Sequence, residues 1–410
     1  MTKPAIAVEA VVLEGHIVDS LLLPKVLDAI LARGGRYHIA ELKLGERQDD
    51  PSRATIEIHA DSAEVLEAIL AEIHAHGAVP ANAKDCETVR ADVSGAFPEG
   101  FYCSTNFRTQ VRCGGEWIEV EDQEMDCGVV LDADGSSARC VPMTEVRVGD
   151  RIVVGRDGTR VMPPEGEARR HGLFEFMASP VSSERPKAVG VREIATAMKA
   201  ARSRGEKIVA VLGPAVVHTG AGEHVVQLIR RGFLQVLFAG NALAVHDMEQ
   251  AFYGTSLGVS LDRGLPTDEG HEHHLRTINT IRRLGGIRPA VERGVLKSGI
   301  MYECATRGVS TVLCGSIRDD GPIPDVITDI LVAQTEMRKH VPGTGFCLMV
   351  GTTLHSIAVG NLLPAWVKVA CVDINPATVT KLMDRGSTQT VGIVSDAEPF
   401  LRSLVSELAK

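Results

Sequence analysis

The C-terminal half of the chain alternates short apolar runs with amphipathic stretches. An apolar run at 208–212 meets a glycine-containing loop, and apolar residues then recur at helical spacing over 225–229. A second apolar run at 234–238 opens into Gly240 and Asn241. This order predicts a βαβ unit, because parallel strands need such a crossover. The six runs that read as buried strands lie at 208–212, 234–238, 311–314, 346–350, 367–372 and 390–394.

Each of these predicted strands leads into a loop of small or acidic residues. The carboxyl ends of parallel strands meet at one edge of a sheet, and ligands of open α/β folds bind there. We therefore expect residues 186–410 to form a Rossmann-like parallel sheet with a ligand at this edge.

The N-terminal region shows a different order of elements. Strand and helix patterns follow one another as β-α-β-β-α, and Asp61 or Ser62 can cap the second helix. With a final strand near 78–89, this order predicts a ferredoxin-like α+β domain over residues 1–97.

Residues 98–185 are predicted to form a small β domain and a linker. Gly114 and Gly115 mark a hairpin turn, and a strand pattern covers 138–155. Residues 156–186 are rich in glycine, proline, serine and charge, which is typical of a linker, with an apolar anchor at 173–177.

Composition narrows the possible partners. The 410 residues carry a formal net charge of −10, no basic block and only 4% aromatic residues, which argues against nucleic-acid binding. No apolar run is long enough to span a membrane, and we expect no signal peptide and a cytoplasmic location. The nine cysteines have no C-x-x-C spacing, so reduced thiols are expected rather than disulfides or zinc ligands.

The glycine loops at 219–222 and 240–242 are candidate phosphate sites. Glycine lets backbone N–H groups approach a pyrophosphate, and a helix N-terminus favours anions. Neither loop has the G-x-G-x-x-G or Walker pattern, so an ordinary tight turn is the alternative. Asp373 and Asp396 each follow a predicted strand and could accept hydrogen bonds from a ribose diol. The alternative is that Asp373 or Asn375 caps a helix.

Three further sites have both a functional and a plain interpretation. His271 to His274 lack the spacing of a zincin, so a solvated helix start is favoured over a metal site. Cys127 has only carboxylates as sequence neighbours, which favours a buried thiol over a nucleophile. Asn106 lies in a stretch of donors suited to an α-carboxylate, and Arg108 could grip that group or form a surface salt bridge.

Several long stretches carry a family resemblance. Residues 11–28 (VVLEGHIVDSLLLPKVLD), 98–111 (PEGFYCSTNFRTQV), 124–132 (EMDCGVVLD) and 373–387 (DINPATVTKLMDRGS) resemble the archaeal-type ornithine cyclodeaminase family. The N-terminal part resembles the conserved domain of lysine-ketoglutarate reductase/saccharopine dehydrogenase, and the same modules occur behind arginine dihydrolases in cyanobacteria. The α/β part is also similar to deoxyhypusine synthase at 219–221, 239–241, 314–316 and 395–397. The catalytic lysine segment of that enzyme survives only as Trp366-Val367-Lys368, without its glycine.

The resemblance implies NAD at the sheet edge and conversion of L-ornithine to L-proline and ammonia. We also expect no metal, and a homo-oligomer, dimer or tetramer, because doubly wound NAD domains commonly pair. The candidate catalytic residues form a second wall of the site: Asn106, Arg108, Glu124, Asp126 and Cys127. The candidate cofactor-binding residues are Thr219, Gly220, Gly240, Asn241, Ala242, Gly315, Asp320, Gly351, Thr352, Thr353, Leu354, His355, Asp373, Asn375, Asp396 and Ala397.

Three other functions remain open. A deoxyhypusine-synthase-like aminobutyl transferase would not explain the N-terminal domains. An amino-acid dehydrogenase of the saccharopine or opine type would form net NADH, whereas cyclodeamination forms none. A non-catalytic sensor would bind NAD and ornithine without forming proline.

Overall fold

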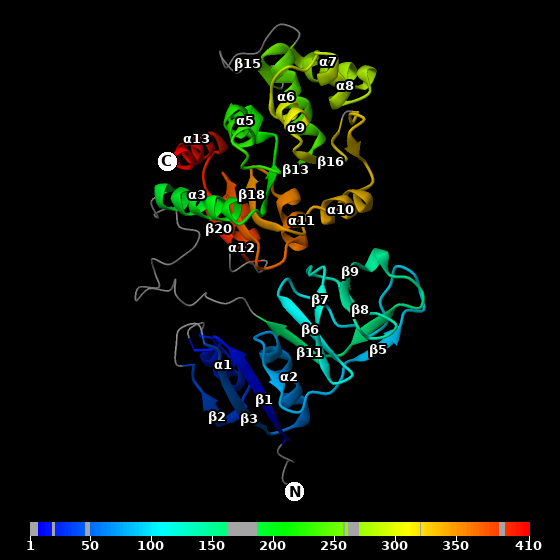
Figure 1. The fold of residues 1–410 in the computed structure, drawn as a ribbon, viewed down its shortest axis with the longest axis vertical. Helices are drawn as coiled ribbons and strands as arrows, with labels where there is room; N and C mark the ends of the chain where they lie inside the picture. The colour runs from blue at the N-terminus through cyan, green and yellow to red at the C-terminus, as the bar shows by residue number, and fades with distance from the viewer. Residues whose placement is uncertain are drawn as a thin grey trace. The chain divides into compact units, whose positions relative to one another are not determined.

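The computed structural model describes residues 7–18, 21–45, 50–162, 187–256, 259–260, 270–319, 321–384 and 390–410 (Figure 1). The chain divides into two compact units. Unit 1 comprises Met1–Ala178 and Leu363–Ala365, and unit 2 comprises Ser179–Leu362 and Trp366–Lys410.

The N-terminal part of unit 1 is an antiparallel sheet in the order β2-β3-β1-β4, covered by two helices. Its elements are β1 (Ala7–Gly15), α1 (Leu22–Ala32), β2 (Arg36–Lys43), β3 (Ser52–Ala60), α2 (Ala63–His74) and β4 (Val79–Pro80). The side chains of β3 alternate between buried and less buried positions, as a half-buried strand requires. Ser62 caps α2 by accepting a hydrogen bond from Val65 N at 3.3 Å. The predicted ferredoxin-like fold is confirmed.

The second sheet of unit 1 has seven strands in the order β11-β6-β7-β9-β8-β10-β5. They are β5 (Glu87–Arg90), β6 (Arg108–Cys113), β7 (Glu116–Glu121), β8 (Gly128–Leu131), β9 (Ala138–Val141), β10 (Arg151–Val154) and β11 (Thr159–Met162). Gly114 and Gly115 have φ of 60° and 87° and form the predicted hairpin turn between β6 and β7.

Three strand predictions for unit 1 need correction. The final strand near 78–89 is split, because β4 pairs with β1 whereas β5 pairs with β10 in the other sheet. The strand pattern over 138–155 is interrupted by the 3₁₀ turn Met143–Glu145. The predicted linker begins with β11, which pairs with β6, and its apolar anchor at 173–177 lies outside the described residues.

Unit 2 is built on a parallel seven-stranded sheet in the order β17-β16-β13-β12-β18-β19-β20. The strands are β12 (Lys207–Leu212), β13 (Val236–Gly240), β16 (Ser310–Cys314), β17 (Val326–Ile327), β18 (Thr344–Val350), β19 (Lys368–Asp373) and β20 (Thr390–Val394). The predicted Rossmann-like parallel sheet is confirmed. The sequence prediction missed β17, because two residues carry no recognisable strand pattern.

The chain leaves β12 in one direction along the sheet and returns to β18 on the other side of β12. Right-handed crossovers in opposite directions place helices on both faces of the sheet (Figure 1). The helices are α3 (Lys187–Ser203), α4 (Ala215–His218), α5 (Gly222–Arg230), α6 (Asn241–Tyr253), α7 (Gly270–Leu284), α8 (Ile287–Glu292), α9 (Ile300–Arg307), α10 (Ile330–Arg338), α11 (Leu354–Leu362), α12 (Pro376–Asp384) and α13 (Ala397–Ala409). A short hairpin, β14 (Thr255–Ser256) with β15 (Val259–Ser260), follows α6.

Each of the three large sheets has its own hydrophobic core. The largest core lies in unit 2 and includes Phe346 and Leu348 from β18, whereas unit 1 has separate cores under its two sheets.

All nine cysteines are free thiols, and the five buried ones are Cys127, Cys140, Cys304, Cys347 and Cys371. No described helix has the length and apolar character needed to cross a bilayer.

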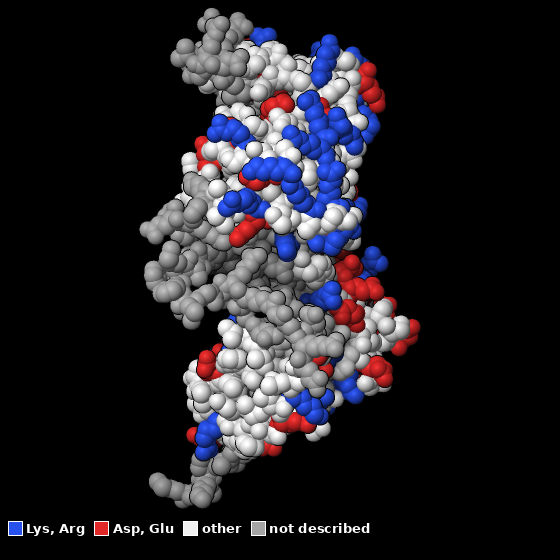
Figure 2. Space-filling model, turned by 60° about the vertical axis from the view of Figure 1, so that its left-hand side comes forward, with Lys and Arg blue, Asp and Glu red and all other residues white. Residues whose placement is uncertain are grey.

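The surface charge is uneven despite the net charge of −10. Figure 2 shows Lys and Arg side chains gathered on one face of unit 2. Part of the cationic charge of this unit is neutralised locally. Glu303 accepts from Arg230 at 2.7 Å and from Arg307 at 2.6 Å.

Candidate functional site

The strand order of unit 2 reverses between β12 and β18, and the carboxyl ends of these strands form a topological switch point. Gly213 follows β12, and its N–H donates to Val350 O at 3.0 Å. Gly351 follows β18 with φ of 64°. A Cβ atom on Gly213 would lie 1.9 Å from the carbonyl oxygen of Gly351. The two loops therefore approach closely enough that the backbone itself lines the switch point. The sequence prediction included Gly351 but missed Gly213.

The predicted loop after β12 contains a helical turn. The helix α4 separates Gly213 from Thr219 and Gly220, so these two residues do not directly follow the strand. Gly220 has φ of 79°, and Gly222 begins α5. The sequence prediction missed α4 because four residues after a proline carry too little pattern to indicate a helix.

The loops after β13 and β16 are tied together by one side chain. Asn241 begins α6 and is 3% exposed, and its Oδ1 accepts from Ile323 N at 3.1 Å. This bond gives Asn241 a structural role in addition to the predicted cofactor contact. Gly240 and Ala242 flank Asn241, while Gly315 follows β16 and donates its N–H to Ile327 O. Asp320 lies outside the described residues.

The loop after β18 brings His355 to the end of β16. His355 Nε2 lies 3.8 Å from Cys314 Sγ, although β12 and β13 separate the two parent strands. Burial lowers the pKa of His355 to about 4, so its imidazole is neutral at pH 7. The hydroxyls of Thr353 and Thr378 are 2.8 Å apart and tie this loop to α12.

The other predicted residues of this loop are more open. Thr352 is half-buried, and Leu354 is 83% exposed. Ser356, in the first turn of α11, was missed from the sequence. Its hydroxyl is buried and has no hydrogen-bond partner within the described part of the chain.

The acidic residues after β19 and β20, Asp373 and Asp396, differ in their hydrogen bonds. Asp373 Oδ1 accepts from Asn375 N at 2.8 Å, and Asn375 Oδ1 in turn accepts from Ala377 N at 3.0 Å. Asn375 therefore caps α12, which was the alternative interpretation of this loop. Asp396 stands at the N-cap position of α13, before Ala397, but its side chain makes no capping hydrogen bond. Capping thus does not account for either aspartate.

The candidate catalytic residues lie in unit 1, on two segments that hydrogen-bond to each other. Ser104 Oγ donates to Glu124 O at 2.6 Å and accepts from Cys127 N at 3.0 Å. Ser104 O accepts from Asp126 N at 3.1 Å. Ser104 was not predicted, yet it joins the two predicted stretches.

The exposure of these side chains separates their possible roles. Arg108 and Asp126 are exposed, and Asp126 adopts a left-handed conformation with φ of 63°. Asn106 and Glu124 are buried. Cys127 is 1% exposed and belongs to the core of its sheet, with Sγ 3.7 Å from Met125 O. This placement favours packing over nucleophilic chemistry for Cys127.

The histidines at the start of α7 are not a simple solvated helix start. His273 Nδ1 lies 2.9 Å from Thr255 Oγ1, and the His273 ring stacks on Tyr253 at a centroid distance of 4.5 Å. The side chain of His271 lies outside the described residues. No group of three potential metal ligands is present among the residues that the structure describes.

The carboxyl edge of unit 2 has the features that a dinucleotide requires. A Cβ on Gly213 would lie 1.9 Å from Gly351 O, so the loops after β12 and β18 pack backbone against backbone at the switch point. The helices α11 and α13 begin at this edge. Asp373 and Asp396 supply acceptors suited to ribose hydroxyls, and Ser356 supplies a buried hydroxyl without a partner among the described residues. These residues fit NAD.

Three family models together cover most of the chain. The model described as arginine dihydrolase ArgZ-like, C-terminal, Rossmann fold, matches residues 192–404. The first region of the same C-terminal part matches residues 108–191. The LOR/SDH bifunctional enzyme conserved region matches residues 8–107.

The archaeal relatives span the same length as this chain, whereas it covers only 58% of the cyanobacterial ArgZ and AgrE chains. The ornithine cyclodeaminase of Methanothermobacter thermautotrophicus is 52% identical over 398 residues, which is 97% of either chain. The apo crystal structure of ArgZ, a cyanobacterial arginine dihydrolase, is 39% identical with a TM-score of 0.83 and covers 99% of this chain and 58% of that one. AgrE in ternary complex with ornithine and NAD+ is 42% identical with a TM-score of 0.54, covering 98% and 58%. The chain therefore belongs to the ornithine cyclodeaminase family.

Proposed function

We propose that this protein is an NAD-dependent ornithine cyclodeaminase that converts L-ornithine to L-proline and ammonia. The observation that carries the proposal is the switch-point edge of unit 2, whose residues fit a dinucleotide, in a chain 42% identical to AgrE, which binds ornithine and NAD+. Bound NAD+ would accept a hydride from the α-carbon of ornithine and return it to the cyclic imine.

The residues of the chain bind and orient the reactants. Gly213 and Gly351 admit the pyrophosphate, and Asp373 and Asp396 accept hydrogen bonds from ribose hydroxyls. Precise orientation of the α-carbon against the nicotinamide provides much of the rate enhancement.

For the substrate, we propose that Arg108 binds the α-carboxylate, while Glu124 and Asp126 attract the ammonium groups. Three further properties stay predictions from the sequence. They are the domain limits at 1–97, 98–185 and 186–410, the cytoplasmic location, and the dimeric or tetrameric state.

The decisive experiment incubates the purified protein with ornithine and a substoichiometric amount of NAD+, then measures proline, ammonia and NADH. We expect proline and ammonia in equal amounts, many turnovers per NAD+, and no accumulation of NADH. Accumulating NADH would instead identify an amino-acid dehydrogenase. Binding of both ligands without product would identify a sensor.

The substrate role of Asp126 is tested by Asp126→Asn. Loss of the carboxylate should raise the KM for ornithine at least about tenfold, because a charge-assisted contact is removed. The Kd for NAD+ should stay unchanged. Steady-state kinetics with calorimetry checks both values, and Asp134→Asn, an exposed aspartate in the turn between β8 and β9, is the matched control. An unchanged KM removes Asp126 from the site.

A further inference from the structure

A cluster of histidines around a buried glutamate lies beside the carboxyl edge of unit 2. It joins four elements: α4 supplies His218, α6 supplies His246 and Glu249, β14 supplies Thr255, and α7 supplies His273. The rings of His218 and His246 are 4.7 Å apart, and those of His246 and His274 are 5.8 Å apart. The sequence prediction missed the cluster because its members come from segments far apart in the chain.

Glu249 is the centre of the hydrogen-bonded chain. It is 0% exposed, and its Oε1 accepts from Thr255 Oγ1 at 2.9 Å. Its Oε2 lies 3.0 Å from His246 Nδ1. Because a carboxylate only accepts hydrogen bonds, His246 carries its proton on Nδ1 and leaves Nε2 as a proton acceptor. A base oriented by a buried carboxylate is an arrangement suited to proton transfer.

The cluster adjoins the predicted cofactor loop. His218 directly precedes Thr219 and Gly220, and its Nδ1 lies 2.7 Å from Ser256 Oγ. A Cβ atom on Gly222 would lie 3.7 Å from Gln250 Oε1. Gln250 follows His246 by one helical turn, so this face of α6 points toward the loop at 219–222.

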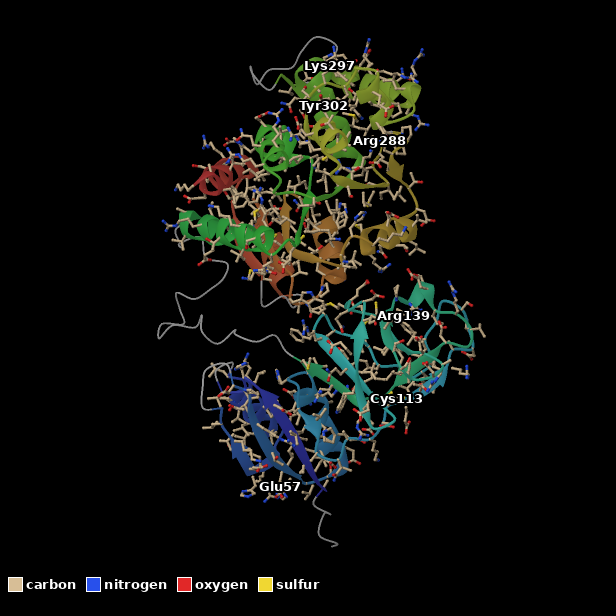
Figure 3. All side chains as sticks on the ribbon, viewed as in Figure 1. Glu57, Cys113, Arg139, Arg288, Lys297 and Tyr302 are labelled. Atoms are coloured by element: carbon tan, nitrogen blue, oxygen red, sulfur yellow. The ribbon has the colours of Figure 1, made fainter. Side chains whose placement is uncertain are left out.

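The neighbouring face of α6 is held by a different contact. Asp247 accepts from Ile300 N at 2.7 Å and from Met301 N at 2.8 Å, at the start of α9. Helix α9 also carries Tyr302, which is labelled in Figure 3. Because the two Asp247 contacts fix α6 to α9, His246 lies on a rigid element, as a proton-transfer group requires.

We propose that His246, oriented by Glu249, is the general base of the cyclodeaminase reaction. The inference rests on the proposed function. The α-ammonium group of ornithine gives one proton to His246 Nε2 and becomes a neutral amine. The nitrogen lone pair then forms the C=N bond as the hydride leaves the α-carbon for NAD+. The δ-nitrogen loses its ammonium proton to water, attacks the imine carbon as a neutral amine and gives up a second proton as the Cα–Nδ bond forms. The imidazolium returns its proton to the α-nitrogen, whose bond to the α-carbon breaks as ammonia leaves and the ring C=N bond forms. Ammonia and the ring nitrogen of proline each take up one proton, so that base and proton count are restored with each turnover.

The first test is His246→Gln. We expect kcat to fall by about 10²–10⁴-fold, the range for loss of a general base, with the Kd for NAD+ unchanged within twofold. The matched control is His340→Gln. His340 follows α10 and precedes β18, at the amino edge of the sheet, and also neighbours a glutamate, with Nε2 3.9 Å from Glu336 Oε1. The control should keep the wild-type kcat.

The second test is Glu249→Gln, read out without turnover. The amide of the variant can present either its oxygen or its NH2 group to Nδ1, so it no longer fixes one tautomer of His246. The ¹⁵N resonances of the ring should report the Nδ1–H tautomer in the wild type and a mixture of both tautomers in the variant. The kcat of the variant should fall at least about 10²-fold.

These tests separate the two claims. A wild-type protein that forms no proline overturns the proposed function and this inference with it. An active wild type together with an active His246→Gln variant overturns the inference alone. Should His246→Gln not fold, an unchanged tautomer and kcat in Glu249→Gln overturns it instead.

Discussion

Burial at the carboxyl edge of unit 2 changes the pKa of one side chain, His355. Its pKa is lowered to about 4 by burial, whereas an imidazole in the unfolded chain titrates near 6.5. Between pH 4 and pH 6.5, His355 is protonated in the unfolded chain and neutral in the folded protein. The stability that neutral His355 contributes is therefore present above pH 6.5 and is lost as the pH falls toward 4.

The variant His355→Gln should be less sensitive to acid. Between pH 7 and pH 5 the wild type should lose up to about 2 kcal/mol more of its unfolding free energy than the variant, since glutamine does not titrate. Urea unfolding at both pH values measures the difference. Equal losses in the two proteins would show that His355 titrates normally in the folded state.

Residue-level prediction worked where the cause is local. Ser62 was one of two predicted caps because a hydroxyl before an apolar helical pattern satisfies free N–H groups, and it is the cap. The environments of Asn241 and His246 were not predictable in this way. Their contacts come from segments far away in the sequence, such as Ile323 for Asn241.

At the scale of elements, length decides what the sequence reveals. The strand β18 has seven consecutive buried residues and was predicted from its apolar run. The two residues of β17 and the four of α4 are too short for periodicity. The pairing of β5 with β10 escaped prediction because register depends on a strand far along the chain.

Replacing glycine by alanine should change the unfolding free energy in opposite directions at Gly213, in the loop after β12, and at Gly360, inside α11. Gly213→Ala places a Cβ 1.9 Å from Gly351 O, so the backbone must shift, at a cost of at least about 2 kcal/mol. Gly360→Ala lies inside α11, where the new Cβ meets Leu382 Cδ2 at 3.7 Å. It should stabilise the helix by up to about 1 kcal/mol.

Chemical denaturation and NAD+ titration of both alanine variants check this prediction. Gly213→Ala should also weaken NAD+ binding at least about tenfold, because it disturbs the switch point. If Gly213→Ala binds NAD+ as tightly as the wild type and Gly360→Ala do, the switch point is not the cofactor site.

At the scale of the whole molecule, unit 1 and unit 2 have separate hydrophobic cores. A ligand stabilises the unit that binds it, by about 2.7 kcal/mol at a hundredfold excess over Kd. We therefore expect NAD+ to slow hydrogen exchange at the loops that contain Gly213, Gly351 and Asp396. Ornithine added afterwards should slow exchange at 104–108 and 123–127. Mass spectrometry localises both effects, and ornithine protection confined to unit 2 would remove the unit 1 residues from the substrate site.

The distribution of the buried cysteines gives the protein natural reporters of opening. Burial raises the pKa of Cys140 in unit 1 and of Cys304 and Cys347 in unit 2, so these thiols are unreactive while their unit is closed. Cys103 is exposed and should be alkylated first. Pulse alkylation followed by peptide mapping can thus time the unfolding of each unit in the unmodified chain, without introduced probes.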